Sequence, residues 1–114
     1  MDHQRKKELK ALYKQRKPPM GVYVYECLPT GKVYIGYTQD TKGTINGNNF
    51  KLNSGMFKNK HLLKDWEQYG MEQFSIRVVE SLDYDEDETK TDYTEDLQIL
   101  LEDWKTKWNE TEEI

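Results

Sequence analysis

At 114 residues, the chain is long enough for one domain around a single hydrophobic core and too short for two. Its single cysteine, Cys27, excludes an internal disulfide, and no apolar run is long enough for a signal segment or a membrane span. We therefore expect a protein of a reducing cytoplasm, either bacterial or of a phage-infected cell, with no membrane partner.

The net charge of −4 hides a strong polarity along the chain. Residues 1–20 sum to +5, residues 21–80 to +1 and residues 81–114 to −10. Lys and Arg attract nucleic acid because they neutralise phosphates and release counterions. The acidic run of residues 83–92 is either a solvated loop or a docking surface for a basic protein partner. The sequence predicts DNA contacts from the basic positions of the first segment: Arg5, Lys6, Lys10, Lys14, Arg16 and Lys17.

The first half of the chain predicts a helix, a hairpin and a loop. Residues 2–17 contain good helix formers, and Pro18 and Pro19 end that helix. Residues 21–27 and 33–38 alternate β-branched and aromatic side chains around the turn sequence LPTGK, which predicts a β-hairpin. Residues 39–58 are rich in Asn, Gly, Thr and Ser, so we expect mostly loop, with at most a short helix at residues 48–52.

The second half predicts a helix, a strand and a second helix. Asn59 is a suitable N-cap before NKHLLKDWEQYG, and Gly70 a suitable C-cap. Residues 74–82 alternate as a third strand, and apolar residues then recur every three or four positions between Tyr93 and Trp108. The predicted fold class is α+β, with a three-stranded antiparallel or mixed sheet flanked by helices. We expect a basic helix and linker at 1–19, the domain at 20–110 and a tail at 111–114.

Two triplets in the hairpin carry a family signature. Gly21-Val22-Tyr23 and Tyr34-Ile35-Gly36, with ten residues between the tyrosines, resemble the signature of the GIY-YIG nuclease superfamily. The order of elements after the hairpin also resembles that family, and the entry sequence KPPMGVY resembles its small bacterial and phage members. The resemblance implies a GIY-YIG-like fold over residues 20–108.

The resemblance also implies metal-dependent cleavage of a DNA strand. In the family the first tyrosine activates the attacking water, the second helps to hold the site, an arginine stabilises the phosphate and a glutamate binds Mg²⁺ or Mn²⁺. Guanidinium and metal suit a transition state that gathers negative charge on phosphate oxygens. Tyr23 and Tyr34 match the two tyrosines, and Gly21, Val22, Ile35 and Gly36 complete the signature.

The match fails at the arginine, because no arginine occurs between Arg16 and Arg77. Lys42 and Lys51 are the substitute cations, although lysine lacks the planar fork that holds a phosphate with two parallel bonds. Glu102 is the candidate metal ligand.

Other family positions also differ. Glu95 is the second candidate for the metal ligand, and Asn109 is available beyond the last helix. Where some relatives have a histidine, this chain has Met56 and Phe57, so His61 is the nearest alternative.

Three hypotheses follow. The first is a degenerate nuclease that acts by binding nucleic acid or a protein, for instance as a phage-encoded regulator or inhibitor, and it is the one that we adopt. The second is an active Mg²⁺- or Mn²⁺-dependent endonuclease. The third is an unrelated small protein-interaction domain whose triplets arose by chance.

Overall fold

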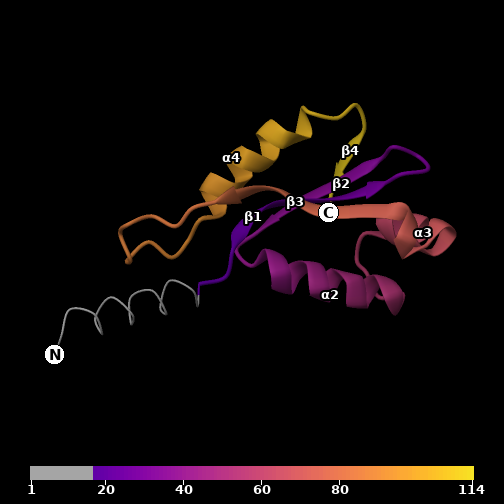
Figure 1. The fold of residues 1–114 in the computed structure, drawn as a ribbon, viewed down its shortest axis with the longest axis horizontal. Helices are drawn as coiled ribbons and strands as arrows, with labels where there is room; N and C mark the ends of the chain where they lie inside the picture. The colour runs from indigo at the N-terminus through magenta and orange to yellow at the C-terminus, as the bar shows by residue number, and fades with distance from the viewer. Residues whose placement is uncertain (1–16) are drawn as a thin grey trace.

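The computed structural model describes residues 17–114, which form a mixed sheet with helices on both faces (Figure 1). Among these residues, no helix combines the length and the apolar character needed to cross a membrane. The predicted basic helix at 2–17 lies outside the described residues except for Lys17. In chain order the elements are β1 (Met20–Cys27), β2 (Val33–Thr38), α2 (Thr41–Asn53), α3 (Lys60–Tyr69), the short 3₁₀ turn η1 (Met71–Gln73), β3 (Phe74–Leu82), α4 (Thr94–Lys105) and β4 (Thr111–Glu113).

The sheet has the strand order β3-β1-β2-β4. The hairpin partner β2 and the strand β3 are both antiparallel to β1, whereas β4 runs parallel to β2. The predicted antiparallel or mixed α+β architecture is confirmed, but the sheet gains a fourth strand. Residues 111–113, expected to be part of a tail, pair with Val33, Tyr34 and Ile35 because β2 offers an open edge to a parallel neighbour.

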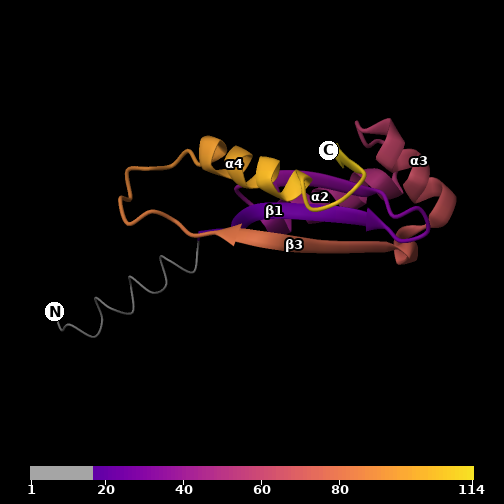
Figure 2. The same cartoon turned by 90° about the horizontal axis from the view of Figure 1, so that it is seen from above.

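Alternation along β1 and β2 divides the core between two faces of the sheet. Valines 22, 24 and 33 and Ile35 pack on one face with Leu101 of α4. Tyr23, Tyr25 and Tyr34 pack on the other face with Leu52, Leu62, Leu63 and Trp66 of α2 and α3. The view in Figure 2 shows α4 lying over the sheet, with α2 behind it. All three tyrosines therefore face the α2–α3 layer.

The expectation of a loop at residues 39–58 is wrong, because Thr41–Asn53 form α2. The Asp40 side chain caps this helix by accepting from the Gly43 N–H, and the Thr41 N–H donates to the Pro19 carbonyl. Leu52 is buried against the tyrosine cluster. These capping and tertiary contacts outweigh the weak helix propensity of Asn and Gly, on which the expectation of a loop was based.

Two signature glycines are required by close backbone and ring contacts. A Cβ on Gly21 would meet the Glu80 carbonyl oxygen and lie 2.9 Å from the Ser81 Cα, where β3 bulges against β1. A Cβ on Gly36 would lie 2.7 Å from the Tyr23 hydroxyl oxygen and 2.8 Å from the ring carbon that bears it. Gly21 thus lets β3 approach β1, and Gly36 leaves room for the Tyr23 phenol.

Candidate functional site

The two signature tyrosines share one face of the sheet but send their hydroxyls into different pockets. In the hairpin register Tyr23 lies opposite Gly36, and Tyr34 lies opposite Tyr25. The Tyr23 hydroxyl accepts a hydrogen bond from Asn48 Nδ2 at 3.3 Å. The Tyr34 hydroxyl donates instead to Asp65 Oδ2 at 2.5 Å. The two phenols therefore have separate partners, one on α2 and one on α3.

The pocket at Tyr23 is polar, and its charged side chains are Lys58 and Glu113. It has a volume of about 370 Å³. From α2 it receives Thr44 and Asn48, which are four residues apart and so lie on one face of the helix. The Thr38 and Thr44 hydroxyls are 2.7 Å apart at its edge. The pocket is lined by Tyr23, Gly36, Tyr37, Thr38, Thr44, Asn48, Lys58, Glu113 and Ile114.

The surroundings of Tyr23 favour the neutral phenol. The residue is only 4% exposed. Burial raises the pKa of the Tyr23 hydroxyl above its ordinary value, and the hydrogen bond from Asn48 offsets this only in part. A tyrosine acts as a base near neutral pH only when a positive field lowers its pKa. The shift at Tyr23 has the opposite sign.

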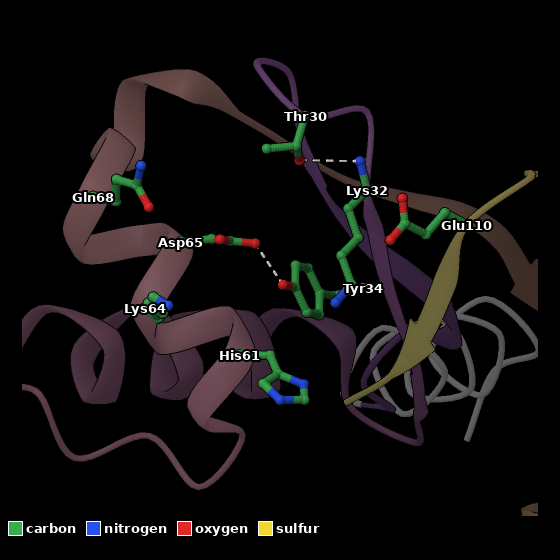
Figure 3. A pocket seen from close by; sticks show the side chains of 8 residues that line it. All are labelled: Thr30, Lys32, Tyr34, His61, Lys64, Asp65, Gln68 and Glu110. Atoms are coloured by element: carbon green, nitrogen blue, oxygen red, sulfur yellow. Dashed lines mark hydrogen bonds between the residues drawn. The ribbon is translucent and has the colours of Figure 1, made fainter.

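The second pocket, of about 310 Å³, surrounds the Tyr34 hydroxyl between α3 and the hairpin (Figure 3). Figure 3 shows Asp65 of α3 pointing directly at the phenol, with the Lys32 side chain alongside the ring. The Lys32 ammonium lies 4.9 Å from the ring centroid. Burial, and next the Asp65 carboxylate, raise the pKa of the Tyr34 phenol. Tyr34 is therefore a hydrogen-bond donor that fastens α3 to β2.

His61, noted in the sequence as the histidine nearest to a family position, contacts β4. Its Nδ1 lies 2.7 Å from Glu112 Oε1. Asn59 Nδ2 donates to Glu112 Oε2 at 3.1 Å, and the Lys32 ammonium lies 3.7 Å from Oε1. Burial raises the pKa of Glu112. The hydrogen bonds and the Lys32 charge together lower this pKa by more than burial raises it, so the Glu112 pKa lies below its ordinary value. This cluster holds β4 against α3.

The substitute cations predicted from the sequence do not line the Tyr23 pocket. Lys42 and Lys51 are exposed on α2, whose side chains toward Tyr23 are the neutral Thr44 and Asn48. Lys58, in the loop before α3, is the cation that lines this pocket among the described residues. No local sequence pattern marks Lys58, because only the folding of α2 and α3 onto the sheet brings it to Tyr23.

Neither glutamate predicted as a metal ligand lies on the Tyr23 face of the sheet. Glu102 is exposed on α4, on the opposite face of the sheet from Tyr23, and pairs with Lys105 at 3.4 Å. Glu95 lies in the first turn of the same helix. Glu113 reaches the rim of the Tyr23 pocket, but its carboxylate lies 3.6 Å from the Lys105 ammonium. Within residues 17–114, no three His, Cys, Asp or Glu side chains are grouped closely enough to hold a metal ion.

The remaining sequence-predicted residues fall into two sets. Val22 and Ile35 of the signature are core residues that face α4. Lys17, at the start of the described chain, has its ammonium 5.1 Å from the centroid of the Tyr84 ring. The other predicted nucleic-acid contacts, Arg5, Lys6, Lys10, Lys14 and Arg16, lie outside the described residues.

The hairpin with its two triplets, the helices on its tyrosine face and the third strand define a GIY-YIG-like fold. Two solved structures are similar to the chain. One is the catalytic domain of the homing endonuclease I-TevI, a GIY-YIG nuclease, with a TM-score of 0.64 and 18% identity over 79% of this chain and 88% of that one. The other is a glutamate-to-alanine mutant of the same domain, with a TM-score of 0.58 and 18% identity over 80% of this chain and 84% of that one. No protein-family model and no curated protein matches the sequence.

Proposed function

We propose that this chain is a nuclease-fold domain that binds nucleic acid without cleaving it. The observation that carries the proposal is the composition of the Tyr23 pocket, where a buried neutral phenol is surrounded by Thr38, Thr44 and Asn48. Such groups donate hydrogen bonds to a phosphate. They do not supply the concentrated positive charge that a cleavage transition state requires.

Cleavage is disfavoured for two physical reasons. A phosphodiester gathers charge on its oxygens as it is cut, and removing a single preorganised donor from such a site commonly costs about 10²–10³ in rate. Here the predicted cation positions, Lys42 and Lys51, lie away from the pocket, and Lys58 lacks the fork of a guanidinium. The raised pKa of Tyr23 also disfavours the ionised phenol that would act as the base.

Binding to nucleic acid is supported by the distribution of charge across the sheet. The α2–α3 layer, residues 41–70, contains Asp65 and Glu67 as its carboxylates. Its cations outnumber them and belong to exposed side chains, so this face suits a phosphate backbone. These cations are Lys42, Lys51, Lys58, Lys60 and Lys64.

The binding experiment measures the affinity for short single- and double-stranded DNA and RNA between about 50 and 200 mM salt. Replacing Lys51 and Lys58 by Gln should weaken binding and reduce the slope of log K against log salt by about 0.9 for each phosphate that is no longer neutralised. Lys105→Gln with Lys107→Gln is the matched control, because it makes the same change of charge on the α4 face. Equal effects of both pairs would refute an interface on the α2–α3 face, and no binding at any salt would refute the function.

The second candidate is an active Mg²⁺- or Mn²⁺-dependent endonuclease, and the position of Lys58 in the Tyr23 pocket favours it. A supercoiled-plasmid nicking assay with either metal separates the two candidates. We expect no nicking above background for the wild type. Metal-dependent nicking that disappears in Tyr23→Phe would establish the endonuclease and overturn our proposal.

A further inference from the structure

The outer face of α4 presents carboxylates around one exposed apolar side chain. Glu95, Ile99 and Glu102 are spaced by four and three residues, which places them on one side of the helix. Ile99 is 65% exposed, whereas Leu97 and Leu101 are buried in the core. The outer face of α4 is therefore acidic, with one apolar side chain between its carboxylates.

The acidic loop, residues 83–92, continues this face toward the start of the described chain. The Tyr84 hydroxyl donates to the Pro18 carbonyl at 2.6 Å, and the Lys17 ammonium lies over the Tyr84 ring. Tyr84 in turn packs on Tyr93, the residue that precedes α4, at 5.4 Å between ring centroids. Lys17 and Pro18, where the described chain begins, therefore lie beside the acidic loop and close to the start of α4.

The sequence of residues 5–16, RKKELKALYKQR, is complementary to that face in charge and in pattern. Its apolar residues, Leu9, Leu12 and Tyr13, are spaced to lie on one side of a helix, and Lys and Arg occupy most other positions. The segment has the same number of residues as α4, which is 12 residues and about 18 Å long. Twelve residues span at most about 40 Å when extended, so a segment of this length is longer than α4.

We propose that residues 5–16 dock on the outer face of α4 and the acidic loop when nucleic acid is absent. The docked segment covers Ile99, and its cations pair with Glu86, Glu88 and Glu95. These three carboxylates have no hydrogen bond or ion pair within residues 17–114. A polyanion that binds residues 5–16 must first displace them from α4 and the acidic loop, so the acidic face weakens nucleic-acid binding. This last consequence rests on the proposed function, whereas the docking does not.

Docking is tested without nucleic acid by carbodiimide cross-linking, which joins a carboxylate to a lysine amine only when the two are in contact. In the monomer, Lys6, Lys7, Lys10 or Lys14 should link to Glu86, Glu88 or Glu95, as mapped by mass spectrometry. The links should disappear at about 1 M salt, where charges interact over only about 3 Å. A mixture of isotopically light and heavy chains distinguishes docking within one chain from docking between two copies.

The competition is tested with the triple variant Glu86→Gln, Glu88→Gln and Glu95→Gln. It should bind DNA about tenfold more tightly than the wild type, a change of about 1.4 kcal/mol. The control variant changes three carboxylates outside α4, the acidic loop and residues 41–70, namely Glu26, Glu72 and Glu110, to Gln. Because the net charge changes equally, the difference between the two variants measures the contribution of docking.

The cross-linking results test docking, and the DNA affinities test the competition. Cross-links within one chain support docking, and they continue to support it if the protein binds no nucleic acid, a result that refutes the proposed function alone. An absence of links at low salt overturns docking, and links found only between light and heavy chains replace it with self-association. If the triple variant and the control gain equal affinity, the α4 face does not compete with nucleic acid.

Discussion

The hydrogen bond between Tyr34 and Asp65 gives the most direct test of whether this signature tyrosine is structural. Tyr34→Phe removes one oxygen and leaves the ring, with Lys32 beside it, in place. A hydrogen bond to a charged group contributes about 1.5–3 kcal/mol to stability. Asp65 is partly exposed, and water compensates for part of the missing hydrogen bond. We therefore expect the free energy of unfolding to decrease by about 1.5 kcal/mol, the lower end of this range.

The decrease in stability is measured by urea unfolding, with the control Tyr37→Phe on the same strand. The Tyr37 hydroxyl accepts only a long hydrogen bond from Gln98, at 3.3 Å near the surface, so its removal should cost less than about 0.5 kcal/mol. For a domain of this size, 1.5 kcal/mol corresponds to a fall in Tm of about 6–12 °C. In a double-mutant cycle, Tyr34→Phe and Asp65→Ala should be coupled by about 1 kcal/mol. Stability that is unchanged or increased in Tyr34→Phe would refute the structural role.

Three further predictions concern the phenols, β4 and a signature glycine. Burial raises the pKa of Tyr23, so Tyr23 should not titrate near neutral pH, and the stability of the folded protein should fall above about pH 10, where the unfolded phenol ionises first. Absorbance at 295 nm compares the wild type with Tyr23→Phe, and a phenol that titrates near pH 7 in the wild type alone would contradict this. The pKa of Glu112 is lowered, so its contribution is present above about pH 4.3 and is lost as the pH falls through the lower folded value. Glu112→Gln should therefore lower the free energy of unfolding by about 1 kcal/mol at pH 7. It should also speed amide exchange at Ile114, whose N–H donates to the Ile35 carbonyl. Unchanged exchange would show that Glu112 does not hold β4. Gly21→Ala should destabilise the fold by about 2–3 kcal/mol in urea unfolding, because its Cβ meets backbone atoms of β3, and a neutral result would mean that β3 can move away.

How far the sequence predicts this protein differs between its elements. The hairpin, the helix capped by Asn59 and the strand at 74–82 were predictable because each has a strong local pattern. Helix α2 was not, since its stability comes from the Asp40 cap, a bond to Pro19 and burial of Leu52, of which only the cap is visible locally. The same holds for β4, whose three residues have no pattern of their own and pair with an edge already built by the hairpin.

The candidate site divides in the same way. The sequence by itself determined the GIY-YIG signature, the absence of an arginine between positions 16 and 77 and the segregation of charge along the chain, because these are properties of residue order. Only the tertiary structure decided that Tyr23 meets Asn48, that Tyr34 is tied to Asp65 and that Lys58 rather than Lys42 or Lys51 lines the pocket. The physical reason is that a side chain's partners, and hence its pKa, are set by distances between elements that are remote in the sequence.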